Sequence, residues 1–131
     1  MKKLFVLSLL TVFALSGYSQ ENEKEGKPKI SFEKMTHEFG KISEGTKASH
    51  KFKFTNEGDA PLVIKNVQPS CGCTTPKWPK KPIMPGESDV IKAVYDSKGR
   101  PGNFHKTVTV KTNLAKNSKK VLHIKGNVKS K

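Results

Sequence analysis

Residues 49–67, SHKFKFTNEGDAPLVIKNV, decide the fold of this chain. The first eight alternate, with His50 and two phenylalanines on one side and lysines or threonine on the other. A period of two is typical of a β-strand with one buried face, because successive side chains of a strand point to opposite faces of the sheet. NEGDAP (residues 56–61) then supplies a turn, in which we expect Asn56 and Gly58 to take the positive φ of a tight reversal. The stretch therefore predicts two strands joined by a turn.

The same pattern recurs along the rest of the chain. Runs rich in valine, isoleucine, threonine and aromatic residues alternate with segments rich in glycine, proline and asparagine, and no stretch has helical periodicity. The further expected strands cover residues 30–32, 62–67, 89–96, 104–112 and 120–128, with a short one around Phe39. Short strands at this spacing in about 100 residues are typical of one small sandwich. We therefore predict an all-β fold, a single immunoglobulin-like antiparallel β-sandwich of about seven strands.

The start of the chain predicts export. Two lysines precede the apolar run LFVLSLLTVFAL (residues 4–15), which is long enough for a secretory signal and too short for a membrane span. Small residues two positions apart favour cleavage before Gln20. We expect a signal peptide over residues 1–19, a flexible lead-in over residues 20–29 and one domain over residues 30–129. The mature protein is expected to be periplasmic or extracellular, with no transmembrane span after signal removal.

Three segments carry a resemblance to a known family. They are FGKISEG (residues 39–45), FKFTNEGDAPLVIKNVQPSCGCTTPKWPKKPIMPGE (residues 52–87) and YDSKGRPGNFHKTVTVKTN (residues 95–113). On these segments the chain resembles the bacterial exported family named domain of unknown function fifteen-seventy-three. That family in turn resembles the immunoglobulin-like domains of the major sperm protein and ciliary ASH type, which implies the same sandwich. The resemblance implies no reaction, because the family has no assigned activity.

The two cysteines, Cys71 and Cys73, are separated only by Gly72. An immunoglobulin inter-sheet disulfide joins cysteines many residues apart, so this pair cannot serve that purpose. In an oxidising compartment we expect a local disulfide, with Gly72 adopting unusual backbone angles, or a pair of packed thiols. Two alternatives stay open. The pair could exchange thiols with a partner. It could also bind Cu(I) or Zn(II) together with His37, His50, His105 or Met84.

The loop PKWPKKP (residues 76–82) supplies the candidate binding surface. Trp78 could fold back as a lid over the core, or it could stand out with Lys77, Lys80 and Lys81 as a basic aromatic patch. The formal net charge of +14 favours encounters with anionic partners. The alternative is a solvated lysine-rich surface without a partner, because the lysines are scattered along the chain. Nucleic acid is not expected outside the cytoplasm, so an envelope protein or an anionic glycan is the expected partner.

The sequence carries no pattern for catalysis or for a cofactor. It has no glycine-rich phosphate loop, no GxSxG and no HExxH motif, and its 11 acidic residues are scattered. We therefore expect no enzyme and no cofactor, with catalysis left open only for the cysteine pair. The predicted function is a non-enzymatic binding or structural module of the cell envelope. The alternative is a thiol-redox or metal-binding protein that acts through Cys71, Gly72 and Cys73.

Overall fold

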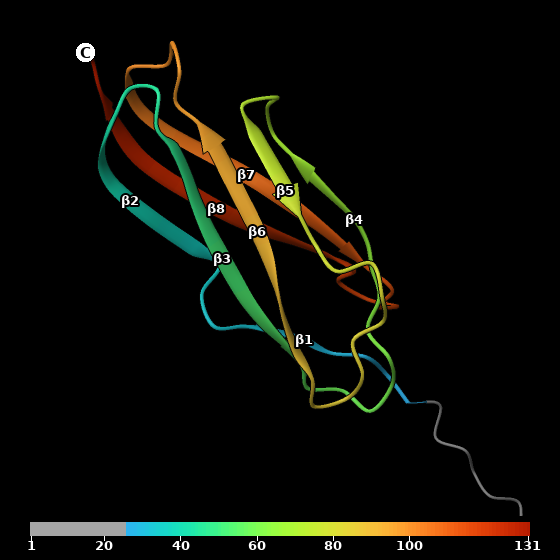
Figure 1. Cartoon of the computed structure of the whole chain (residues 1–131). Helices are drawn as coiled ribbons and strands as arrows, with labels where there is room; N and C mark the ends of the chain where they lie inside the picture. The colour runs from blue at the N-terminus through green and yellow to red at the C-terminus, as the bar shows by residue number, and fades with distance from the viewer. Residues whose placement is uncertain (1–25) are drawn as a thin grey trace, which may run out of the picture.

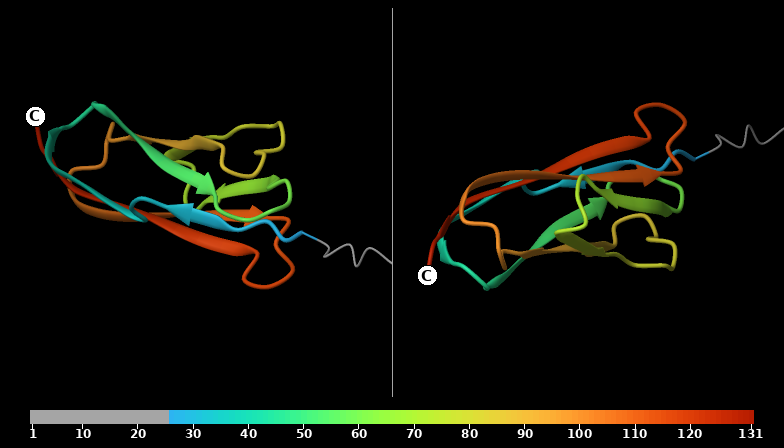
Figure 2. Two further views of the ribbon diagram at one scale, coloured as in Figure 1. Left: turned by 90° about the horizontal axis from the view of Figure 1, so that it is seen from below. Right: turned by 90° about the horizontal axis from the view of Figure 1, so that it is seen from above.

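Two four-stranded sheets packed face to face make up the part of the chain that the computed structural model describes, residues 26–131 (Figure 1, Figure 2). The strands are β1 (Ile30–Phe32), β2 (Thr36–Ser43), β3 (Lys47–Asn56), β4 (Ile64–Pro69), β5 (Thr74–Lys77), β6 (Ser88–Asp96), β7 (Gly102–Thr112) and β8 (Lys119–Lys129). The predicted all-β immunoglobulin-like sandwich is confirmed. The expected signal peptide and the first part of the lead-in lie outside the described residues. From residue 26 onward, no helix is long and apolar enough to cross a membrane.

The strand order is that of an immunoglobulin sandwich whose first strand is divided between the two sheets. Sheet A has the order β1-β3-β6-β5 and sheet B the order β2-β8-β7-β4. These correspond to the A-B-E-D and C-F-G sheets of the constant-type fold, with β2 added to the second. Five of the six strand pairs are antiparallel, as expected, and the β2–β8 pair is parallel. The parallel pair arises because the chain crosses from sheet A to sheet B after β1 and joins the edge beside the last strand.

The core lies between the sheets and follows the period-two pattern. Alternate residues of the long strands face the core, and most of them are buried, among them Phe52, Phe54, Ile91, Tyr95, Val108, Val110, Leu122 and Ile124. Tyr95 of sheet A stacks on Phe104 of sheet B, with ring centroids 4.0 Å apart. The alternate residues of each strand therefore form the two outer faces.

The sequence does not predict strand β5, because it assigns residues 76–82 to a loop. Its four residues show no alternation and include Pro76. β5 is nevertheless a strand because it pairs with β6 along its whole length, from Thr74 opposite Tyr95 to Lys77 opposite Lys92. Proline is tolerated there because β5 is an edge strand, on which a missing N–H breaks no bond within the sheet when it faces outward.

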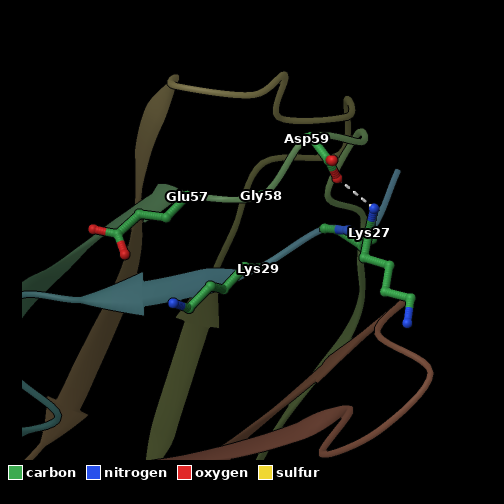
Figure 3. A pocket seen from close by; sticks show the side chains of 6 residues that line it. Lys27, Lys29, Glu57, Gly58 and Asp59 are labelled. Carbon is green, nitrogen blue, oxygen red and sulfur yellow. Dashed lines mark hydrogen bonds between the residues drawn. The ribbon is translucent and has the colours of Figure 1, made fainter. Parts of the chain in front are cut away.

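Strand pairing begins before residue 30, within the segment expected to be a lead-in. Lys27 accepts a backbone hydrogen bond from Asp59 at 3.0 Å, and Lys29 accepts one from Glu57 at 2.9 Å. The Asp59 side chain in turn accepts a hydrogen bond from the backbone N–H of Lys27 at 2.6 Å (Figure 3). These pairs continue the register in which Ile30 faces the end of β3. Residues 27–29 therefore extend β1 along the turn that follows β3.

Gly58 is required by this close approach of two backbones. Neither Asn56 nor Gly58 has the positive φ expected of them. A Cβ atom at position 58 would instead lie 2.7 Å from the carbonyl carbon of Pro28 and would clash with the carbonyl oxygen of Lys27. The turn sequence was recognised correctly, but the reason for its glycine was not.

We expect Gly58→Ala to lower the free energy of unfolding by about 2 kcal/mol, because the added methyl group must push residues 27–29 off the turn. Gly72→Ala is the matched control. Gly72 has no positive φ, and a Cβ there would meet nothing within 4 Å, so we expect a change within about 0.5 kcal/mol. Chemical denaturation of both variants measures the difference. Equal effects at the two positions would contradict the proposed docking of the lead-in.

Candidate functional site

The cysteine loop, residues 70–73, joins β4 of sheet B to β5 of sheet A. On the sheet B side, Ser70 donates a backbone hydrogen bond to Thr107 at 2.9 Å, and the N–H of Thr107 donates to the Ser70 hydroxyl at 3.1 Å. On the sheet A side, Asp96 donates to the carbonyl of Cys73 at 2.8 Å. The loop is therefore held to both sheets independently of its sulfur atoms.

Cys71 and Cys73 are paired as a disulfide whose Cα atoms lie 5.3 Å apart. Cys73 is buried in the core and Cys71 is half-buried at its margin. Gly72 is exposed and does not have positive φ, so the unusual backbone angles expected for it are not needed. Only Cys71 is placed where a partner thiol could reach it, and thiol exchange stays a prediction.

The structure does not bring a histidine to the cysteines. Within residues 26–131, no group of three or more histidine, cysteine or acidic side chains is arranged to hold a metal ion. The histidines instead form two pairs, His37 with His50 and His105 with His123. The copper or zinc alternative for the cysteine loop therefore gains no histidine or carboxylate ligand within residues 26–131.

The first histidine pair joins the two sheets, because His37 lies on β2 of sheet B and His50 lies on β3 of sheet A. The rings of His37 on β2 and His50 on β3 stack with centroids 3.7 Å apart and planes 7° apart. Phe39 and Phe52 flank this stack edge-on. Burial, followed by the charges of His37 and Lys34, lowers the pKa of His50 below 6.5. Folding therefore favours the neutral form of His50.

Trp78 lies just beyond β5, where it both covers the core and contacts a lysine. Its ring is half-buried and packs against the core. The ammonium group of Lys80 lies over the same ring, 3.1 Å from its centroid, which is a cation–π contact. Lys77 and Lys81 are exposed. The indole therefore packs between the core and the Lys80 ammonium group. The exposed positive charges of this segment come from Lys77, Lys80 and Lys81.

The outer face of sheet A carries three lysines in one line across adjacent strands. Lys51 on β3 lies opposite Lys92 on β6, and Lys92 lies opposite Lys77 on β5. We call Lys51, Lys92 and Lys77 the lysine row. The one ion pair among residues 26–131 joins Lys53 to Glu33 at 3.6 Å, so no carboxylate neutralises the row. Of these three lysines, only Lys77 is a candidate from the sequence, because the row exists only once β3, β6 and β5 are in register.

The chain belongs to the family described as protein of unknown function (DUF1573), whose model matches residues 30–128. No curated protein matches it significantly. A protein of unknown function from Porphyromonas gingivalis W83 is similar, with 17% identity and a TM-score of 0.64 over 78% of this chain and 46% of that one. The ASH/PapD-like domain of human CEP192 is similar at 8% identity and a TM-score of 0.65, over 80% of this chain and 88% of that one.

A third similar structure is the secreted serine protease VesC from Vibrio cholerae, with 13% identity and a TM-score of 0.59 over 76% of this chain and 23% of that one. At these identities the likeness shows the fold alone. The chain spans less than half of the P. gingivalis protein and about a quarter of VesC. The family resemblance noted in the sequence is thus confirmed, and it assigns no activity.

We expect reduction of the disulfide to lower the free energy of unfolding by only about 1 kcal/mol, because the bridge closes a loop far shorter than the 15 residues that correspond to about 3 kcal/mol. Denaturation with and without dithiothreitol measures this difference. Cys71→Ser, which cannot form the bridge, should be insensitive to the reductant. Loss of cooperative unfolding on reduction would show that the backbone bonds of Ser70 and Cys73 do not hold the loop.

Stability should fall as the pH drops below 6.5, because the unfolded chain then binds a proton at His50 more readily than the folded chain, in which the pKa is lowered. The contribution of neutral His50 to the free energy of unfolding is fully present above pH 6.5. It is lost as the pH falls from 6.5 through the lowered pKa of His50 in the folded state. His50→Gln should remove that part of the pH dependence. Urea denaturation at a series of pH values measures it, and identical pH profiles for both proteins would contradict the assignment.

Proposed function

We propose that this chain is an exported, non-enzymatic binding module of the cell envelope, and that the outer face of sheet A binds an anionic glycan. The lysine row is the observation that carries the proposal. Its three charges come from three hydrogen-bonded strands, so their spacing is set by the sheet at about 4.8 Å per strand. A ligand with regularly spaced negative charges would meet a preformed line of cations.

The row carries a cost that a ligand would relieve. Like charges placed directly opposite each other on neighbouring strands are destabilising, by a few tenths to about 1 kcal/mol for each pair. Lys92 takes part in two such pairs, with Lys51 and with Lys77. Two rows away, by contrast, Lys47 faces Asp96 on the same face, and the charges are complementary. Binding of an anion along the row would replace repulsion by attraction without moving the backbone.

The surroundings of the row suit a sugar chain. Val90 and Val94 flank Lys92 on the outer face and are only half-buried, which leaves apolar surface for the faces of sugar rings. Lys80 and Lys81 continue the positive charge beyond the end of β5. Export is supported by the apolar N-terminal run and its lysines. The non-enzymatic role is supported by the sequence, whose acidic residues are scattered and which carries no GxSxG or HExxH motif.

One substitution in the lysine row should change protein stability and glycan affinity in opposite directions. Lys92→Thr should raise the free energy of unfolding by about 0.5 to 1 kcal/mol, because it removes both repulsive pairs, and it should weaken glycan binding at least about tenfold. Calorimetric titration with heparin oligosaccharides, used as a model anionic glycan, measures the affinity. Poly-glutamate is the parallel probe for an acidic protein partner, and tighter binding of that probe would replace the glycan by a protein.

Two variants with the same net charge distinguish binding at the lysine row from attraction by the total positive charge of the protein. The triple variant of Lys51, Lys77 and Lys92 to Gln and the triple variant of Lys98, Lys111 and Lys119 to Gln lose the same formal charge. The first should lose binding and the second should change affinity less than about threefold. Equal losses, or binding that is abolished alike by moderate salt, would reduce the interaction to nonspecific attraction and contradict the proposal.

A further inference from the structure

The second histidine pair lies on the outer face of sheet B. His105 on β7 and His123 on β8 are diagonal neighbours, because Lys125 is opposite His105 and Thr107 is opposite His123. The Nε2 atom of His105 lies 2.9 Å from the Nδ1 atom of His123. His105 is exposed and His123 is half-buried. Two imidazole nitrogens therefore converge at a solvent-accessible position that neither the core nor the lysine row uses.

The distance between these nitrogens suits two ligands of one metal ion. Metal–imidazole bonds measure about 2.0–2.1 Å, so two nitrogens 2.9 Å apart subtend an angle of about 90° at a shared ion. That is the angle between neighbouring ligands in square-planar or tetragonal sites, which Cu(II) and Ni(II) prefer. We propose that His105 and His123 form a two-histidine chelate for Cu(II). Water completes the coordination, since no third metal-binding side chain joins the pair within residues 26–131.

The chemistry of the pair favours copper over other divalent ions. Affinity for nitrogen ligands rises along the series to Cu(II) and falls again at Zn(II), which in addition prefers a wider tetrahedral angle. A metal displaces the hydrogen bond that now joins the two rings, so both imidazoles must be neutral at the bonding nitrogens. Because protons compete with the metal for these nitrogens, copper binding should weaken as the pH falls. The positive charge of Lys125, opposite His105, opposes the approach of a cation and limits the affinity.

The other histidine pair provides an internal control. The rings of His37 and His50 lie face to face, 3.7 Å apart and nearly parallel, so their in-plane lone pairs run side by side and do not converge on one ion. The same residue type thus occurs in a chelating and a non-chelating arrangement within one domain. The disulfide keeps both sulfur atoms from acting as thiolate ligands while the protein is oxidised.

The test is titration of the oxidised full chain with Cu(II) alone, followed by calorimetry and by pulsed electron paramagnetic resonance. We expect one ion per chain with two bound imidazoles. His105→Ala and His123→Ala should each lower the affinity at least tenfold and leave one imidazole at the ion, whereas His37→Gln should retain the affinity within about twofold.

The resonance spectrum of the unaltered chain keeps the test decisive if a variant fails to fold, because it counts imidazole ligands without any substitution. Substoichiometric Cu(II) should also broaden the NMR signals around His105 and His123 before any others. Absence of binding at millimolar Cu(II), one imidazole or none in the unaltered chain, or first broadening at His37 and His50 would overturn the proposal.

Discussion

The buried side-chain amide of Asn56 is the interaction on which the arrangement of sheet A depends. It is fully buried, and it donates to the carbonyls of Ala60 and Ile83 at 2.8 and 2.9 Å. Its oxygen accepts hydrogen bonds from the N–H groups of Gly58 at 2.9 Å and Lys29 at 3.3 Å. One side chain thus ties the N-terminal extension, the turn after β3 and the segment before β6 to a single point. An unpaired amide here would be costly, so folding of each of these segments favours folding of the other two.

This constraint also sets the register that creates the lysine row. The backbone N–H of Asn56 donates to Glu87 at 2.9 Å, which aligns the end of β3 with the start of β6. With that alignment, Lys51 falls opposite Lys92 on the outer face. A slip of one residue would turn every side chain of a strand to the opposite face and bury the lysines. The polar network at one end of the sandwich therefore determines which charges meet on its surface.

Much of the fold could be predicted from local pattern, and the site could not. Alternation around Phe52 and Phe54 reveals a strand and the outward direction of Lys51, because a period of two is a local property. β5 escapes prediction because Pro76 and its short length hide it, and only pairing with β6 makes it a strand. The lysine row and the His105–His123 pair depend on long-range register, which no window of sequence contains. Gly58 is recognisable as a turn residue from the sequence. The reason for its glycine is not, because the backbone that it contacts, residues 27–29, lies about 30 residues earlier in the chain.

The outer face of sheet A carries the lysine row, and the outer face of sheet B carries a pair of imidazoles beside lysines such as Lys125. The sheet A face is the proposed ligand surface, and mapping of backbone amide shifts by NMR during titration with a heparin oligosaccharide is the decisive experiment. Saturable shifts should concentrate on β3, β5 and β6 around Lys51, Lys77 and Lys92. Shifts spread evenly over both faces, or centred on β7 and β8, would contradict this proposal.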